Sequence, residues 1–284
     1  MENGYIDLHT HTNLSDGRLT PRELIVAARA AGIRVLAITD HNAIQAGLPL
    51  LRQEFTDMEL PWGCEVSCRD TGIPDEIHIV GLFFDPNHPA MQSILARNKL
   101  DRRPRIEGIF RRLREECGME LGTYEALQAE NPDCEFVGRA HIAEKMVRLG
   151  YVKDTAEAYD VYIGNFGQRR AFVEKDLAYI PIEDAVRGIL AAGGVAILAH
   201  PLYYRIPRER LEQLIAKFAA LGGQAMEVRY AYYGQEEEAY LEAQARKHGL
   251  RISAGSDFHG IKPGDFLGRP YPGWIYAKLK EALT

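Results

Sequence analysis

The feature that most constrains this chain is a succession of short apolar runs, rich in branched residues, that alternate with helical patterns. Seven runs have the length and composition of buried strands, namely YIDLHTH, VLAITDH, PWGCEVS, IHIVGLFF, VAILAHP, AMEVRYA and RISAGSDFH. One helical pattern begins with a capping box at Thr20 and Glu23 and stops at Gly32. Another spans residues 208–221 and carries an apolar stripe. Strands that alternate with helices favour a parallel sheet in an α/β layer or barrel.

Polar side chains end nearly every one of these runs. They are His9, His11, Asp40, His41, Glu65, His78, His200, Asp257 and His259. In parallel α/β folds the carboxyl ends of the strands converge on one mouth, so we expect these side chains to meet there. Burial of so many polar groups without partners would cost several kcal/mol per group, which disfavours a purely structural role.

Metal binding is the function that this set of side chains indicates. The chain has nine histidines, and seven lie in such motifs: His9, His11, His41, His78, His141, His200 and His259. Imidazole and carboxylate ligands without thiolate suit manganese, zinc or iron. The four cysteines lack the spacing of a zinc ribbon, and Cys64 and Cys68 are predicted to be small buried residues.

Charge and hydropathy exclude several classes of protein. A net charge of −6 argues against a general nucleic-acid coat and against binding to anionic membranes. No segment approaches 18 uninterrupted apolar residues, and the first residues lack a charged region followed by an apolar stretch. We therefore expect a cytoplasmic protein with no membrane partner. Residues 88–178 lack strand–helix alternation and are predicted to form a helical insertion.

Six motifs, taken in order, resemble those of the polymerase-and-histidinol-phosphatase (PHP) family of the amidohydrolase superfamily. They are DLHTHT…SDG, ITDHN, GCEVS, IHIVG, AHP and SDFH, and they extend from residue 5 to about residue 260. The resemblance implies an α/β fold, a distorted seven-stranded (β/α)7 TIM-like barrel, formed by residues 1–100 and 179–284. It also implies that the helical insertion, residues 101–178, acts as a substrate lid.

The same resemblance implies a cluster of two or three divalent metal ions. We expect Mn²⁺, with Zn²⁺ and Fe²⁺ as alternatives. Four residues would bind the first ion: His9, His11, Glu65 and Asp257. Glu65 would bridge to a second ion, which His78 and His200 would also bind.

The third ion of such a cluster is assigned to Asp16, His41 and His259, which would contact the substrate instead if only two ions bind. Many relatives have histidine where this chain has Asp16. Asp7 and Asp40 each lie close to an expected ligand in the sequence. We expect these two carboxylates to orient imidazoles by accepting hydrogen bonds.

A cluster of divalent ions suits two kinds of hydrolysis. Ions about 3.5–4 Å apart activate water at neutral pH and neutralise charge on a phosphoryl group, which favours phosphate esters. Amide hydrolysis is the rival, and arginines near the site would favour phosphate. Seven arginines and one lysine lie between Arg97 and Arg114. Some of them, Arg111, Arg112 and Arg114, are instead expected to pair with nearby glutamates on a solvated helix face.

Three further motifs resemble one subgroup of the family, which contains 3′,5′-nucleotide bisphosphate phosphatases and a 5′-to-3′ exoribonuclease. They are GRAHIA, YIGNFGQRRAFV and AGGVAILAHP. The residues expected to bind substrate are Arg102, Arg103, Arg139, His141, Arg169 and Arg170. His141 is assigned to a substrate phosphate, with a metal ion as its alternative. The subgroup more often has proline at Ala140 and Arg170, which bears on the shape of the substrate pocket.

The resulting hypothesis is metal-dependent hydrolysis of the 3′-phosphate of a 3′,5′-bisphosphorylated nucleoside, such as adenosine 3′,5′-bisphosphate, to a 5′-mononucleotide and phosphate. Glu65 would hold the ions that activate water. Asp16, His41 or His259 would protonate the departing ribose oxygen. Arginines of the insertion would hold the 5′-phosphate, so that remote binding energy positions the substrate.

Three alternatives remain open. A 5′-to-3′ exoribonuclease acting on short 5′-phosphorylated RNA would use the same cluster, and Tyr203, Tyr204 or Phe258 could stack on its bases. Histidinol phosphatase activity is disfavoured by the long arginine-bearing insertion. A catalytically inactive metal-binding module that supports a partner is the non-enzymatic alternative, although every expected ligand position is filled. No obligate protein partner is implied.

Overall fold

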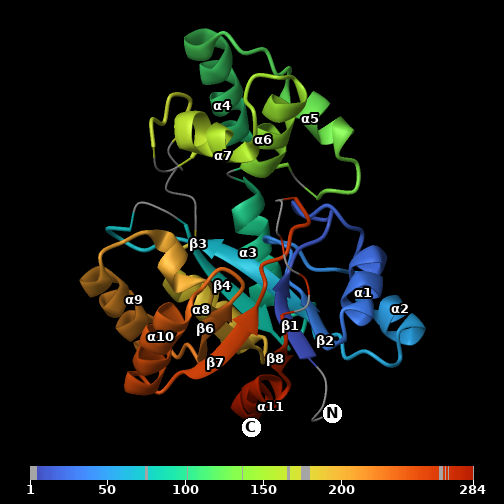
Figure 1. Ribbon diagram of the computed structural model, residues 1–284, viewed down its shortest axis with the longest axis vertical. Helices are drawn as coiled ribbons and strands as arrows, with labels where there is room; N and C mark the ends of the chain where they lie inside the picture. Colours follow the sequence, from blue (N-terminus) through green and yellow to red (C-terminus); the bar gives the residue numbers. More distant parts are fainter. Residues whose placement is uncertain are drawn as a thin grey trace. The chain divides into compact units, whose positions relative to one another are not determined.

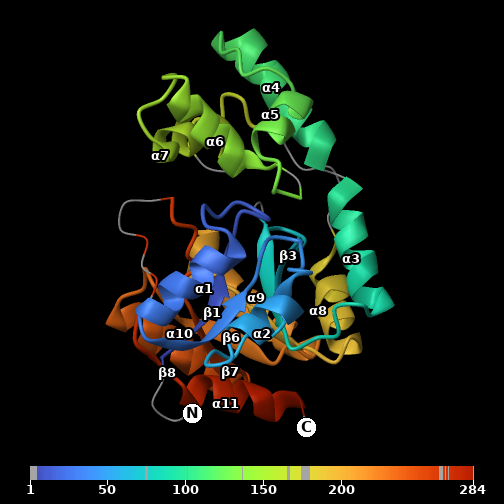
Figure 2. The ribbon, with the colours of Figure 1, turned by 90° about the vertical axis from the view of Figure 1, so that its right-hand side faces the viewer.

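The computed structural model describes residues 5–73, 76–100, 102–135, 137–164, 167–173, 180–261, 265, 267 and 269–283, with the side chains of Leu100 and Arg102 outside this description. Its contacts divide the chain into two compact units (Figures 1 and 2). Unit 1 comprises residues 1–95 and 180–284, and unit 2 comprises residues 96–179. Each unit has a hydrophobic core of its own.

The strands of unit 1 form two sheets. The described strands are β1 (Tyr5–Thr10), β2 (Ile33–Ile38), β3 (Gly63–Cys68), β4 (Ile77–Leu82), β5 (Val195–Leu198), β6 (Ala225–Tyr230), β7 (Arg251–Gly255) and β8 (Tyr271–Pro272). Each of the seven apolar runs overlaps one of the strands β1 to β7, although β2 begins two residues before its run and β3 ends one residue after its run. One sheet has the order β2-β1-β8, and the other has the order β3-β4-β5-β6-β7.

The expected seven-stranded (β/α)7 TIM-like barrel is wrong. β4 is antiparallel to β3 and to β5, and β8 is antiparallel to β1, so the sheets are mixed rather than parallel. The segment between Cys68 and Ile77 is too short for the crossover helix that a parallel pair needs, so β4 returns beside β3. The strands also do not close into a continuous barrel. Within the described ranges, the backbone bridges that connect one sheet with the other are isolated ones, Thr10–Phe258 and His41–Glu65.

Helices cover the outer faces of the sheets. They are α1 (Pro21–Ala30), α2 (Leu48–Glu54), α3 (Pro89–Leu100, which continues into unit 2), α8 (Ile182–Ala191), α9 (Arg208–Ala220), α10 (Gln235–Lys247) and α11 (Trp274–Lys280), with 3₁₀ turns η2 (Pro201–Tyr204) and η3 (Glu281–Leu283). Figure 1 shows α1 and α2 beside β2, and α8, α9 and α10 beside the five-stranded sheet. Among the described residues, no helix is both long and apolar enough to cross a bilayer.

Two of these helices confirm the helical patterns in the sequence. At the start of α1 the Thr20 hydroxyl accepts a hydrogen bond from the Glu23 N–H, and the Glu23 carboxylate accepts one from the Thr20 N–H, which completes the predicted capping box. The second pattern forms α9, which ends one residue before Leu221. Its apolar stripe faces the core through Leu214 and Phe218, both of which are buried.

The two sheets share one apolar core, which holds their strands in place around the polar residues described below. β1 and β2 contribute Ile6, Leu8 and Val35; the larger sheet contributes Val80, Leu82, Ile197 and Ala254; and α11 contributes Ile275 and Leu279. In both views α11 lies beneath the strands (Figures 1 and 2). Burial of each large aliphatic side chain contributes about 1.5–3 kcal/mol, so this core is a major source of rigidity.

Unit 2 is helical, and its described residues contain no strand. Its elements are α4 (Arg102–Cys117), α5 (Tyr124–Glu130), α6 (Arg139–Arg148), the single turn α7 (Thr155–Glu157) and the π-helix η1 (Ala158–Ile163). The core of this unit brings together apolar faces of α4, α6 and η1 through Ile109, Leu113, Ile142, Met146 and Ile163. The expected insertion, residues 101–178, falls within this unit.

Candidate metal centre

The polar residues that end the apolar runs meet at one edge of the strands of unit 1. His9 lies in β1 and His11 just after it, Glu65 lies in β3, and His200 and Asp257 follow β5 and β7. All five lie near the same point because the ends of strands from both sheets meet there. For example, the N–H of His11, after β1, donates to the carbonyl of Phe258, after β7, at 2.9 Å.

His78 reaches this edge in an unexpected way. It is the second residue of β4, not a residue that follows a strand. Because β4 is antiparallel to its neighbours, its first residues lie beside the last residues of β3 and β5. His78 is paired with Ser67, and the next residue, Ile79, with Leu198. β4 therefore places a potential ligand at this edge from its first residues, whereas the parallel strands place theirs from their last residues.

One group of potential ligands consists of His9, His11, Glu65 and Asp257, the residues assigned to the first ion. His9 Nε2 lies 3.2 Å from Glu65 Oε1 and 3.4 Å from Asp257 Oδ1. His11 Nε2 lies 3.4 Å from Glu65 Oε2 and 3.1 Å from Asp257 Oδ1. One donor atom from each residue lies within 4.8 Å of the others. Ligand atoms lie about 2.0–2.2 Å from a zinc-sized ion, so four atoms this close can share one ion.

Glu65 also belongs to a second group. Its Oε1 lies 3.0 Å from His78 Nδ1 and 3.0 Å from His200 Nε2. These are the residues assigned to the second ion. The geometry adds His41, whose Nδ1 lies 2.8 Å from Glu65 Oε2 and which could share an ion with Glu65 and His78. Glu65 is fully buried at the centre of the cluster.

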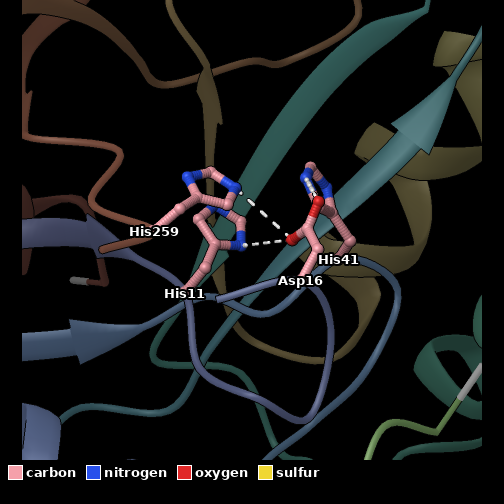
Figure 3. Close-up of side chains that lie close together, drawn as sticks. All are labelled: His11, Asp16, His41 and His259. Carbon is pink, nitrogen blue, oxygen red and sulfur yellow. Dashed lines mark ion pairs between the residues drawn. The ribbon is translucent and has the colours of Figure 1, made fainter. Parts of the chain in front are cut away.

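A third group surrounds Asp16 (Figure 3). Asp16 Oδ1 lies 3.3 Å from His259 Nε2 and 3.9 Å from His11 Nδ1, and Asp16 Oδ2 lies 3.7 Å from His41 Nε2. The residues assigned to the third ion are therefore together, and His11 is added to them. The rings of His11 and His259 are stacked, with centroids 4.1 Å apart. His11 thus lies between the first and third groups.

Buried donor atoms without hydrogen bonds test whether the cluster fits divalent ions. Several find no hydrogen-bond partner among the described residues, including His9 Nε2, both ring nitrogens of His11, His41 Nδ1, Glu65 Oε2 and Asp16 Oδ1. An unsatisfied buried polar atom costs about 1–3 kcal/mol, and here the atoms point at one another. Divalent cations would satisfy them together. A set of imidazole and carboxylate donors without thiolate fits such ions well.

Electrostatics keep the carboxylates of the cluster ionised. Burial alone would raise the pKa of Glu65, but the surrounding imidazoles, His78 foremost, hold that pKa well below its usual value. The pKa of Asp16 is likewise held low against the effect of burial, chiefly by His41. Burial, aided by the charge of neighbouring histidines, lowers the pKa of His11 to about 3. Ionised carboxylates and neutral imidazoles are the forms that bind metals, so His9 and His259, whose pKa values the carboxylates raise against the effect of burial, would release a proton on binding an ion.

Asp7 and Asp40 act differently from the expectation that they orient imidazoles. Asp40 accepts hydrogen bonds from the N–H of Thr12 at 2.8 Å and from the hydroxyl of Ser15 at 2.6 Å. Asp7 accepts one from the N–H of Ser256 at 2.9 Å. Both carboxylates therefore hold the segments that carry His11, Asp16 and Asp257 through these hydrogen bonds.

Glu227 in β6 is a residue that sequence reasoning missed. It is buried, its Oε1 lies 3.2 Å from His9 Nδ1, and its Oε2 accepts the backbone N–H of His200 at 2.7 Å. One carboxylate thus orients the imidazole of one potential ligand and the backbone of another. The available signal was a charged residue in the middle of the apolar run AMEVRYA. Carboxylates that accept from the second nitrogen of a ligand histidine are common at metal sites.

Backbone strain is concentrated at the same residues. His200 has φ 26° and Asp257 has φ 55°, in the left-handed region that residues with side chains rarely adopt. Gly255, two residues before Asp257, lies so close to its neighbours that a Cβ would come within 2.3 Å of His9 Cβ and 2.6 Å of Glu227 Oε1. Strain of this kind persists where the surroundings hold it, often at functional sites.

The residues expected to bind substrate all belong to unit 2. The side chain of Arg102 lies outside the described residues. Arg103 is exposed, and its guanidinium donates to Glu107 at 2.8 Å and pairs with a second glutamate. His141 is buried and accepts the N–H of Gly138 at 3.0 Å, so it caps α6. Substrate binding by these residues stays a prediction.

The remaining arginines contact other parts of unit 2. Arg139 is half-buried and donates to the Ile163 carbonyl at 3.4 Å. Arg169 and Arg170 are exposed, and their guanidinium carbons lie 4.0 Å and 5.5 Å from the ring centroids of Phe172 and Tyr162. Stacking on an aromatic ring leaves the hydrogen-bonding edge of a guanidinium accessible. The exposed Arg170 therefore keeps the capacity to bind an anion.

Comparisons with known proteins agree with the motifs. Residues 7–174 match the family model of the PHP domain. The 5′-3′ exoribonuclease of Haemophilus influenzae is 38% identical over 255 residues, which cover 89% of this chain and 89% of that protein. The 3′,5′-nucleoside bisphosphate phosphatase of Chromobacterium violaceum is 34% identical over 271 residues, which cover 92% of this chain and 88% of that protein.

A solved structure extends the similarity to nearly the whole chain. It is an amidohydrolase from Chromobacterium violaceum with bound sulfate and no metal, 32% identical, with a TM-score of 0.80. The match covers 98% of this chain and 96% of that one. The chain described here belongs to the PHP family.

Proposed function

We propose that this chain is a metal-dependent phosphoesterase that hydrolyses the 3′-phosphate of 3′,5′-bisphosphorylated nucleosides to give a 5′-mononucleotide and phosphate. The position of Glu65 carries the proposal, because its two oxygens lie within 3.4 Å of nitrogens of five histidines. A buried carboxylate with these neighbours suits a ligand that bridges divalent ions. The related phosphatase and exoribonuclease support cleavage of phosphate esters.

The ions would be held by the three groups of side chains. His9, His11, Glu65 and Asp257 would bind the first, Glu65, His78 and His200 the second, and Asp16, His41 and His259 a third. Manganese is our proposed metal, with zinc and iron as alternatives, because all three accept mixed nitrogen and oxygen ligands. Divalent ions supply water activation at neutral pH and stabilisation of negative charge on phosphoryl oxygens.

Exposure separates the roles of the protein side chains. His9, His11 and Glu65 are at most 1% exposed, so they can hold ions but cannot reach a large substrate. In contrast, the side chains of Asp16, His41 and His259 are 20%, 17% and 19% exposed. His78 and Asp257, each 18% exposed, also lie on this accessible side of the cluster. Of the five, we assign protonation of the departing ribose oxygen to Asp16, His41 or His259, whichever is not occupied by a metal, because these three are the residues not needed for the first two ions.

A second phosphate on the substrate would give the enzyme a remote point of attachment. We assign this role to the exposed Arg169 and Arg170, with Arg102, Arg103, Arg139 and His141 as the wider set. Guanidinium groups bind phosphate through paired, charge-assisted hydrogen bonds. Binding energy gained at a phosphate that does not react can position the one that does.

Cleavage of short 5′-phosphorylated RNA is a second candidate function. The relative from Haemophilus influenzae is named a 5′-3′ exoribonuclease and is 38% identical to this chain. A phosphodiester presents the same phosphoryl group with a different leaving group, so the same side chains could serve both reactions. A small nucleotide and a short RNA are thus the two substrate classes to compare.

The test uses protein treated with chelator and then supplied with Mn²⁺, Zn²⁺ or Fe²⁺. Release of phosphate from adenosine 3′,5′-bisphosphate is measured beside digestion of a short 5′-phosphorylated RNA. We expect release only after metal is restored, and none from a His9→Ala variant treated in the same way. Hydrolysis of neither substrate with any of the three metals would overturn the proposal, and digestion of RNA alone would replace it with the exoribonuclease.

A further inference from the structure

Five tyrosines surround the metal-binding edge on the side of His200. Their rings form a continuous network with that histidine: Tyr203, Tyr204 and Tyr230 have centroids 5.9, 5.8 and 5.8 Å from its ring. Tyr232 and Tyr233 extend the network, with centroids 5.5 and 4.8 Å from Tyr230. The mechanism proposed above uses none of these side chains.

The buried members of the network have structural roles. The hydroxyl of Tyr204 donates to the Ala199 carbonyl at 2.8 Å, and that of Tyr230 donates to Asp257 Oδ2 at 2.9 Å. The hydroxyl of Tyr233 accepts the N–H of the residue before Tyr203, in the turn η2, at 3.0 Å. These rings pack against His200 or hydrogen-bond to Asp257 and η2, and their hydroxyls have partners, as buried hydroxyls require.

Tyr203 and Tyr232 differ because they face solvent. Their side chains are 49% and 44% exposed, although each ring packs against the buried Tyr230. The hydroxyl of Tyr232 donates to Asp265 at 2.6 Å, which fixes the orientation of that ring. Half-exposed aromatic rings held against a buried ring, next to a cluster proposed to act on phosphate esters, offer flat surfaces to a ligand.

The backbone on both sides of Tyr203 adopts conformations that are rare for residues with side chains. The turn η2 is bounded by His200 with φ 26° and Arg205 with φ 51°, so residues with side chains adopt left-handed conformations at both ends. Strained segments that the surroundings hold in place are common at ligand sites. The same turn thus positions a predicted metal ligand at one end and an exposed aromatic ring three residues later.

We propose that Tyr203 and Tyr232 form a stacking subsite for the nucleobase of the substrate. The inference rests on the proposed function, because it assigns the base of a nucleotide whose phosphate lies at the cluster. A single ribose separates that phosphate from the base, and a single ring contact of 5.9 Å separates His200 from Tyr203. Stacking accepts every base, since each has a π face, so the subsite would select nucleotides without selecting a sequence.

The test compares substrates with and without a base. The enzyme is assayed on adenosine 3′,5′-bisphosphate and on the matching abasic sugar bisphosphate, using wild type, Tyr203→Ala and Tyr203→Phe. Loss of one stacking contact should raise KM for the nucleotide about 5- to 100-fold, with kcat almost unchanged. The abasic substrate should be unaffected, and Tyr203→Phe should behave as wild type because it keeps the ring. Tyr5→Ala, at a 44% exposed tyrosine elsewhere in unit 1, is the matched control.

A binding experiment separates this inference from the proposed function. Calorimetric titration of adenosine 5′-monophosphate and of ribose 5-phosphate requires no turnover, so it gives a result even if the enzyme hydrolyses neither bisphosphate. We expect tighter binding of the nucleotide, and loss of that preference in Tyr203→Ala. An unchanged KM and an unchanged preference in Tyr203→Ala would overturn the subsite, and so would an equal loss with and without a base.

Discussion

The two units of this chain use charged residues in opposite ways. In unit 1, imidazoles and carboxylates are buried together, and Glu65 contacts five histidines without any exposure to solvent. In unit 2, charged side chains pair at the surface, as in Arg103 with Glu107 at 2.8 Å and Arg112 with Glu116 at 3.6 Å. The buried groups need partners that compensate their charge, whereas the surface groups can pair with many partners or with water.

The physical reason is the cost of burial. An exposed ion pair contributes about 0–1 kcal/mol, so a surface cluster of arginines and glutamates can form without any function. Removal of one partner from a buried charged pair costs about 3–5 kcal/mol, because a charge is left uncompensated. The comparison teaches that buried polar side chains that meet at one point strongly support a function, whereas a run of exposed arginines supports one only weakly.

Replacement of Glu65 should have the largest effect. Glu65→Gln keeps the shape of the side chain but removes the charge that attracts the imidazoles, so metal binding should fall together with kcat/KM. We expect a loss greater than the ~10–100-fold that supporting residues cost at metal sites. Metal content by mass spectrometry and phosphate release measure it, with circular dichroism to confirm folding. A variant that keeps its metal and its activity would show that Glu65 is not a ligand of the metal centre.

Glu227→Gln should have an intermediate effect. The amide can still accept the N–H of His200, but its NH₂ group would face His9 Nδ1, which needs an acceptor there when its other nitrogen binds a metal. We expect metal affinity, measured by calorimetry, to weaken by about 10–100-fold. Glu212→Gln, at an exposed ion pair with Lys247, is the matched control and should change nothing. Equal affinities in both variants would make Glu227 a packing residue only.

Arginine substitutions in unit 2 should have the smallest and most selective effects. Arg170→Ala should lower kcat/KM for adenosine 3′,5′-bisphosphate by about 10–100-fold if its hydrogen bonds to a phosphate are lost, and should spare an aryl phosphate. Arg114→Ala, at an exposed pair with Glu115, should affect neither substrate. An equal loss on both substrates would place Arg170 with Arg112 and Arg114, whose ion pairs at the surface need no substrate.

Much of unit 1 could be predicted from local patterns. The seven apolar runs overlap β1 to β7, and the capping box at Thr20 starts α1. The polar residues that end these runs are together, because strand ends meet wherever strands pair side by side. The match to the PHP family model confirms the family assignment. The assignment could be made from the sequence because its motifs combine residues that are far apart in the chain.

The direction of the strands could not be predicted from the same patterns. A buried strand has the same composition whether it pairs parallel or antiparallel, so the short connection after Cys68 was the sole warning that β4 reverses. The role of Glu227 was also hidden, since its contacts to His9 and His200 join residues 218 and 27 positions apart. Asp40 was placed correctly near the site, but its hydrogen bonds to backbone and hydroxyl groups depend on the conformation of the segment after His11.

The central claim is that unit 1 binds divalent ions at a shared cluster, and calorimetric titration of Mn²⁺ into chelator-treated protein tests it most directly. For the wild-type protein we predict saturable binding of two or three ions per chain. For His9→Ala and His200→Ala, which remove ligands of different groups, we predict fewer ions in each variant. No saturable binding by the wild-type protein, or the same number of ions in all three proteins, would contradict the claim.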